Sequence, residues 1–248
     1  MSFTTEARER QDITSIAVPR LSLKPTINRK SVSSTVLARH STRAFCSKRQ
    51  VPISVVEDSL RLAQHSPSST NLQPWRLTLV SGAALRRLSS ALTSAFRSGA
   101  ELQLPAIPAP YQHYRTTLGQ HVYGPEGYNI PRGDTAAHME AVARNFNFYN
   151  APLIGVVTVD AELSDADVLS VGAWLQTLML LLTEQGLGTQ VSVSTVGYSD
   201  IIRQELGISG DMKILCTIGI GYEDEGEGIN RLKMPRDEWR DSVRYVTE

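Results

Sequence analysis

The chain has 248 residues, with 25 Lys and Arg against 25 Asp and Glu, so its formal net charge is zero. Apolar residues make up 41% and charged residues 20%, as in an ordinary globular protein, and the balanced charge favours neither a nucleic acid nor an anionic membrane as a partner. The two cysteines, Cys46 and Cys216, are too few for a disulfide framework or a zinc site, which indicates a reducing, cytoplasmic compartment.

The first 34 residues are polar and aperiodic and are rich in Ser, Thr and Arg. This composition predicts an N-terminal extension over residues 1–34 that is disordered or wraps a partner surface. It lacks the apolar segment of a signal peptide, and no apolar run in the chain approaches the roughly 20 residues of a membrane span. We therefore expect function to lie in residues 35–248.

The first periodic part of the chain predicts helix, strand, helix. Residues 52–65 predict a helix, and Ser54 and Glu57 within it have the spacing of a capping box, in which each side chain satisfies a backbone donor of the first turn. The apolar run at 75–81 predicts a strand, and residues 82–96 predict a second helix.

Residues 100–133 differ from the rest of the chain. They contain five prolines and four tyrosines, and the segment is too long for a passive connection in a compact domain. Such segments are usually lids or binding segments, and the aromatic content argues against plain disorder. Asp134 then suits the N-cap of a helix predicted for residues 135–149.

The second half of the chain alternates strands with helices. Its longest helix is predicted to begin at the N-cap Ser164 and to end at Gly186, and its apolar stripe is wide enough to pack on a sheet and on a second subunit. The other predicted elements are strands at 152–160, 188–195 and 213–222 and a short capped helix at 199–207. This interleaving, without repeat or linker, predicts one α/β or α+β domain over 35–248, with helices over a central sheet.

A basic group precedes the first of these helices. Arg39, Ser41 and Arg43 alternate, so on an extended segment they share one face. Two guanidiniums and a hydroxyl on one face suit a phosphate dianion. Taken alone, this group is more simply explained as a solvated basic turn. A second basic group, with Arg231 and Lys233, follows the last strand and would alone be a charged surface segment.

The loop at 65–73 is the third polar group, rich in hydroxyl and amide side chains, and is either a simple turn or a set of donors for a ligand. The dinucleotide-binding glycine fingerprint, the phosphate-binding P-loop, the nucleophile elbow and zinc-ligand histidine spacings are absent from the sequence. No catalytic acid, base, nucleophile or metal ligand is therefore assigned.

These groups together, in this order, resemble the nitroreductase family of flavoenzymes over residues 36–248. The segment at 110–153 further resembles the branch that includes nitrobenzoate-type reductases. The stretches that carry the family resemblance are RHSTRAF, VPISVVEDSLRLAQHSPSSTNLQPWRLTLVS, GLGTQVSVST and GYEDEGEGINRLKMPR.

The resemblance implies a homodimeric, three-layer α+β fold, with a central, mostly antiparallel sheet flanked by helices and FMN at the subunit interface. It places the FMN phosphate on Arg39, Ser41, Arg231 and Lys233, and it places Arg43 near the flavin pyrimidine edge, where a cation stabilises the charge that develops on reduction. The full candidate cofactor-binding set is Arg39, His40, Ser41, Arg43, Pro67, Ser68, Ser69, Asn71, Asn145, Gln190, Val191, Ser192, Val193, Ser194, Arg231 and Lys233.

Several of these roles are specific expectations of the resemblance. The loop residues at 67–69 are expected to reach FMN from the partner subunit, whereas Asn71 either joins them or closes the turn. Asn145 is a candidate for the flavin carbonyl edge, and the backbone at 190–194 for the flavin N5 side. Val191 stands where many relatives have proline, which puts the local loop shape in doubt.

The implied activity is ping-pong reduction of nitroaromatics, quinones or similar electron-poor small molecules, with NADH or NADPH as electron donor. Two alternatives stay open: a flavin-dependent dehydrogenase or oxidase of a biosynthetic small molecule, and a non-catalytic flavin-binding protein. Five aromatic residues are candidates to shape the substrate pocket, although for each one packing in the core or on the surface is an equal alternative. They are Tyr111, Tyr114, Tyr123, Phe146 and Phe148.

Overall fold

The computed structural model describes residues 31–247, so residues 1–30 of the predicted extension lie outside the described part of the chain. Residues 32–34 form the first turn of a helix. The helices are α1 (Val32–Ala38), α2 (Ile53–Ala63), α3 (Gly82–Arg97), α4 (Gln112–Tyr123), α5 (Thr135–Ala143), α6 (Asp165–Glu184) and α7 (Ser199–Leu206). The strands are β1 (Arg76–Ser81), β2 (Leu153–Asp160), β3 (Gly188–Ser192) and β4 (Met212–Gly221).

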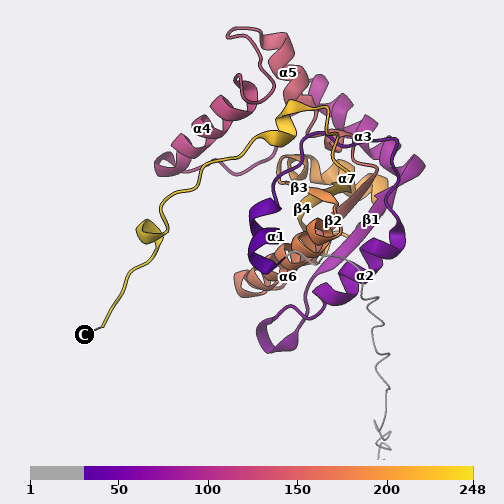
Figure 1. Cartoon of the computed structure of the whole chain (residues 1–248). Helices are drawn as coiled ribbons and strands as arrows, with labels where there is room; N and C mark the ends of the chain where they lie inside the picture. The colour runs from indigo at the N-terminus through magenta and orange to yellow at the C-terminus, as the bar shows by residue number, and fades with distance from the viewer. Residues whose placement is uncertain (1–30, 248) are drawn as a thin grey trace, which may run out of the picture.

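The four strands form one antiparallel sheet in the order β1-β2-β4-β3, which lies between two helical layers (Figure 1). β2 is buried along seven of its eight residues because α2 and α6 cover one face of the sheet and α3 and α7 cover the other. Burial on both faces explains why this strand reads as a continuous apolar run rather than an alternating one. The predicted α+β class, with an antiparallel sheet between helical layers, is confirmed.

The long helix α6 forms as its sequence predicts. The Asp167 carboxylate accepts both the backbone N–H of Ser164, at 3.0 Å, and its hydroxyl, at 2.7 Å. Gly186 ends the helix with φ +78°, a left-handed conformation that glycine adopts without a Cβ penalty. Trp174 is buried on the inner face of α6 and stacks on Trp75 with ring centroids 5.8 Å apart. The helix therefore anchors the start of β1.

Within residues 31–247, α6 is also the one helix long and apolar enough to cross a membrane, judged by length and composition alone. A core helix meets the same criterion, and the inner face of α6 packs on the sheet. Its outer flank is open, and Leu169 there is 76% exposed.

One predicted N-cap is wrong. The helix α2 begins at Ile53, with Pro52 as its N-cap residue and no side-chain cap bond, so Ser54 already lies inside the first turn. Pro52, with φ −63°, is preorganised to start the helix there. The helix α7 is capped at its C-terminal end by Gly207, with φ +65°, and it begins at Ser199 directly after a 3-10 turn, Ser194–Tyr198. That turn also ends the strand predicted for 188–195 at Ser192.

The predicted lid at 100–133 contains a helix that the sequence did not indicate, and the helix predicted after it is shorter than expected. The segment at 100–133 contains α4, and the predicted helix at 135–149 ends at Ala143, although Asp134 does cap it by accepting the N–H of Ala137 at 2.9 Å. The chain then turns through residues 148–150, all three with positive φ. These left-handed residues lead the chain into β2.

One part of the molecule extends away from the sheet. The helix α4 and the C-terminal residues 235–247 both project from the body (Figure 1), and the Tyr114 hydroxyl joins them by donating to the Asp237 carboxylate. Trp239 and Tyr245 in the C-terminal residues are 51% and 75% exposed. Apolar side chains in this segment therefore lack cover within the described residues of this chain.

Candidate cofactor site

The segment at 39–43 lies along the outer edge of β3. Ser41 forms a parallel bridge with Thr189, and the Thr42 N–H donates to the Thr189 carbonyl at 3.0 Å. The segment is therefore extended, as the alternation of its polar residues requires. This pairing places Ser41 beside β3, the strand that carries the predicted residues Gln190 and Val191.

Asn230 fastens the second basic group to this segment. Its amide oxygen accepts the backbone N–H groups of Arg43, at 2.8 Å, and Ala44, at 3.2 Å. Its amide nitrogen donates to the carbonyls of Ala44, at 2.8 Å, and Asp224, at 3.1 Å. Asn230 is 7% exposed and adjoins Arg231 in the chain, so two basic segments distant in sequence lie side by side.

The cations on these segments lack acidic partners. Within residues 31–247, Arg39, Arg43, Arg231 and Lys233 take part in no ion pair. Two of them instead donate weakly to backbone carbonyls, Arg43 to Ser41 and Arg231 to Glu225, each at 3.4 Å. Unpaired guanidinium and ammonium groups gathered on adjoining segments suit a phosphate dianion. This donor set fits the phosphate end of FMN.

His40 lies between two acceptors in the same segment. Its Nδ1 is 3.1 Å from the Ala38 carbonyl at the end of α1, and its Nε2 is 3.0 Å from the Glu223 carboxylate just after β4. The Glu223 contact raises the pKa of His40 above its ordinary value, against the opposing effect of burial. Burial alone would raise the pKa of Glu223, but His40 and the Thr42 hydroxyl, which donates to it at 2.7 Å, lower it.

Glycine at position 188 makes this close approach possible. A Cβ at Gly188 would lie 2.4 Å from the Thr42 hydroxyl oxygen and 3.0 Å from a Glu223 carboxylate oxygen. A Cβ this close to the Thr42 hydroxyl cannot be accommodated unless something moves, so a larger residue would displace the Thr42 and Glu223 side chains from their contact. The strand itself carries two buried hydroxyls, of Thr189 and Ser192, that lack a hydrogen-bond partner among the described residues.

Aromatic residues border the site at Arg43. The Tyr128 hydroxyl donates to the Arg43 carbonyl at 3.3 Å. Burial raises the pKa of Tyr123, and the nearby positive charge of Arg43 opposes that rise. Asn145 is held nearby because its amide oxygen accepts the hydroxyl of Tyr149 at 2.7 Å, and the Tyr149 carbonyl accepts the Phe45 N–H. The structure therefore brings Asn145 and Tyr123 towards the end of segment 39–43.

The predicted substrate residues divide into two groups. Phe146 and Phe148 are each 1% exposed and pack in the core with side chains of α3 and α7, which is the core-packing alternative that the sequence left open for them. They belong to the core because the turn at 146–150 tucks beneath the sheet. Tyr111 and Tyr114, by contrast, are 58% and 48% exposed at the start of the projecting arm.

The loop at 66–73 is strained and is anchored elsewhere. Thr70, Asn71 and Gln73 have φ values of 48°, 57° and 51°, which non-glycine residues rarely adopt. The hydrogen bonds of its backbone and side chains run within the loop, to Ala63 and Arg76 just beside it, or from the Ser69 N–H to the Ser170 hydroxyl of α6 at 3.3 Å. Among the described residues, none of these bonds reaches segment 39–43.

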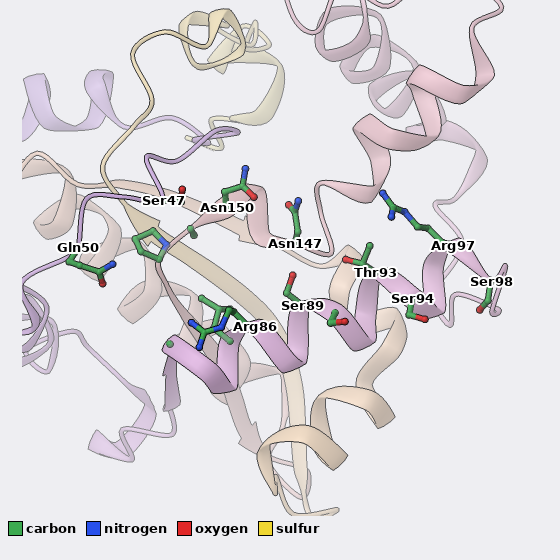
Figure 2. A pocket seen from close by; sticks show the side chains of 15 residues that line it. Ser47, Gln50, Arg86, Ser89, Thr93, Ser94, Arg97, Ser98, Asn147 and Asn150 are labelled. Atoms are coloured by element: carbon green, nitrogen blue, oxygen red, sulfur yellow. The ribbon is translucent and has the colours of Figure 1, made fainter.

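A groove of about 910 Å³ lies between α3 and residues 147–152 (Figure 2). Arg86 and Arg97 lie along it with several serines, but its lining includes no residue of the predicted cofactor set. It is therefore a different feature from the basic site beside β3.

Comparison with known proteins identifies the family. Residues 36–222 match the model of the nitroreductase family. The chain belongs to the nitroreductase family. A 4-nitrobenzoate reductase of Pseudomonas putida is 30% identical over 82% of this nitroreductase-family chain and 89% of its own length. This similarity confirms the predicted likeness to nitrobenzoate reductases.

Two solved structures share the fold of this nitroreductase-family chain. An FMN and NADPH-dependent nitroreductase NfnB from a Sphigopyxis strain is 26% identical, with a TM-score of 0.82 over 88% of this chain and 100% of that one. The FMN-dependent nitroreductase NfnB from Mycobacterium smegmatis, in complex with NADPH, is 28% identical, with a TM-score of 0.79 over 87% of this chain and 97% of that one.

Proposed function

We propose that the chain is an FMN-dependent NAD(P)H oxidoreductase that reduces nitroaromatic compounds or similar electron-poor small molecules. The observation that carries this proposal is the set of unpaired cations on two segments, joined by Asn230, in a member of the nitroreductase family. The similar 4-nitrobenzoate reductase and the FMN- and NADPH-dependent NfnB structures support the substrate class and the cofactors.

The residues divide the work of binding between them. Arg39, Ser41, Arg231 and Lys233 hold the FMN phosphate, and Arg43 lies towards the pyrimidine edge, where a cation favours the reduced flavin. The flavin supplies hydride acceptance and transfer when it is bound.

Other residues border the ring system of the flavin. The backbone at 190–194 lies along one edge, with Asn145 at the carbonyl edge. Tyr123, half-buried near Arg43, borders the space for substrate. The protein needs no acid, base or nucleophile of its own for this scheme, because its residues bind, orient and exclude water.

The site is completed by a second copy of the chain. The loop at 67–71 is anchored to α6 and makes none of its hydrogen bonds to segment 39–43 of its own chain. The outer flank of α6, with Leu169, and the apolar residues at 239–246 are exposed. A homodimer would cover these surfaces and bring Pro67, Ser68, Ser69 and Asn71 to the partner's FMN.

The dimer has a direct test. Light scattering of the purified full chain should give twice the chain mass of 27.3 kDa. The Leu169→Glu variant places a charge in the proposed interface, so its mass should shift towards that of the monomer and it should release FMN. A monomeric wild-type protein that retains FMN would contradict the shared site.

The reaction is tested by anaerobic stopped-flow mixing. NADH or NADPH should bleach the visible flavin absorbance of the purified protein, and subsequent addition of 4-nitrobenzoate should restore it without oxygen. Reduction by an organic substrate but by neither nicotinamide would replace this proposal with a dehydrogenase or oxidase. Bound flavin that no donor reduces would indicate a non-catalytic flavin-binding protein.

The compartment proposed for this enzyme is the cytoplasm. Cys46 and Cys216 are both free thiols, and burial raises the pKa of Cys216 to about 12, so this thiol stays protonated and unreactive. Both features agree with a reducing environment.

A further inference from the structure

The environment of His40 favours its protonated form on geometric grounds. The ring has an oxygen acceptor at each nitrogen, the Ala38 carbonyl at Nδ1 and the Glu223 carboxylate at Nε2. A neutral imidazole donates from only one nitrogen, so the other would place its lone pair against an oxygen. The imidazolium avoids this conflict and places its positive charge 3.0 Å from the Glu223 carboxylate, an ion pair whose Nε2 contact is not aligned as a hydrogen bond. The Ala38 carbonyl also lies at the C-terminal end of α1, where a positive charge is favoured.

Few other charges face this pair. Arg39 adjoins His40 in the same segment and opposes its protonation. The strand β3 brings Gly188, which carries no charge, next to the Glu223 side chain. After β4, the Asp224 carboxylate accepts the Gly226 N–H at 3.0 Å and so is turned into its own loop. The charge state of the pair is therefore set mainly by His40 and Glu223 themselves.

The pair also holds the segment that carries the proposed phosphate ligands. Glu223 accepts the Thr42 hydroxyl and faces His40, so it contacts the segment on both sides of Ser41. At a pH above the pKa of His40, the histidine is neutral and no longer balances the negative charge of Glu223, which then lies uncompensated next to the proposed anion site. Below that pKa, the pair is neutral overall and the clamp on the segment is complete.

We propose that His40 and Glu223 are positioning residues that form a pH-dependent clamp on segment 39–43, which holds FMN more tightly when His40 is protonated. The inference rests on the proposed placement of the FMN phosphate at this segment. Neither side chain is assigned direct contact with the phosphate. Their effect is exerted through the position and the net charge of the segment that binds it.

The expected pH dependence follows from the raised pKa of His40. FMN affinity should be highest near about pH 6.5, where His40 is charged and the phosphate is already largely a dianion, with its second pKa near 6. Affinity should fall by roughly three- to tenfold as the pH rises through the pKa of His40, the size expected for one charge near, but not touching, the ligand. The clamp's contribution to apoprotein stability is likewise complete below about pH 6.5 and is lost as the pH rises through the folded-state pKa of His40.

The experiment measures FMN binding to the apoprotein by quenching of FMN fluorescence, from about pH 6.5 to pH 9. His40→Gln should bind FMN at every pH about as weakly as the wild type does at high pH. Glu223→Gln keeps an acceptor for Thr42 but removes the charge, so at high pH it should bind FMN more tightly than the wild type. A purely structural role for Glu223 would instead weaken binding at every pH.

The chain supplies a matched control in another histidine–glutamate pair. His121 Nδ1 lies 3.1 Å from Glu126 on the projecting arm, and its side chain is 32% exposed against 33% for His40. His121→Gln should keep the wild-type pH profile. If His40→Gln keeps it as well while FMN binds normally, the clamp is refuted and the proposed function stands. An apoprotein that takes up no FMN at any pH refutes the proposed function, and this inference with it.

Discussion

Replacing Arg39 and Arg231 together by alanine should lower FMN affinity by about 100-fold or more. A hydrogen bond to a charged group contributes roughly 1.5–3 kcal/mol, and the double change removes at least two. The fold should survive, because neither guanidinium forms an ion pair within residues 31–247 and Arg231 is exposed. The purified variant should be colourless, with an unfolding midpoint close to that of the wild type.

Titration of the apoprotein with FMN measures the effect, and the single variants refine it. If both arginines hold one phosphate, the two single losses should not add to the double loss, since residues that share a ligand are coupled. The matched control is Arg86→Ala with Arg97→Ala, two arginines of the groove along α3 that lie outside the proposed site. Unchanged FMN occupancy in the Arg39 and Arg231 double variant would show that the phosphate lies elsewhere.

Local patterns in the sequence predicted the elements that build the site. The alternation of Arg39, Ser41 and Arg43 requires an extended segment, and the structure pairs that segment with β3. The caps at Ser164 and Asp134 and the glycine that ends α6 were also readable, because each interaction spans only a few residues. Such features need no knowledge of the rest of the fold.

Contacts between distant parts of the chain were not readable. Asn230 bonds to Arg43 and Ala44, which lie 187 and 186 positions away in the sequence, and an asparagine between an isoleucine and an arginine resembles any turn residue. Glu223 gave no signal either, because it lies within a run of acidic residues that reads as solvated surface. Ser54 failed for the converse reason, since the preceding proline already starts the helix. Whether Phe146 and Phe148 pack in the core or border the substrate was left open, because sequence does not show which way a turn directs its side chains.

Asn230 is therefore the position where one uncharged side chain decides both the fold of the site and its binding. Asn230→Ala removes four hydrogen bonds and leaves the N–H groups of Arg43 and Ala44 without a partner, whereas the Ala44 and Asp224 carbonyls keep a second backbone donor each. Buried backbone groups without partners are costly. We expect the free energy of unfolding to fall by about 2–4 kcal/mol, less than the sum of four lost bonds because water enters the gap.

FMN affinity should fall at the same time, by about tenfold or more, because the segment with Arg231 and Lys233 loses its attachment to segment 39–43. The freed segment then adopts several conformations, of which only one binds FMN, and ordering it costs binding free energy. Chemical denaturation of the apoprotein and FMN titration measure the two effects separately. The matched control is Asn147→Ala, which removes a buried amide oxygen that has no hydrogen-bond partner among the described residues. It should change stability by less than about 0.5 kcal/mol, since no bond is lost. Equal effects of the two substitutions would mean that the amide at 230 merely fills space, and that the two basic segments are held together by other contacts.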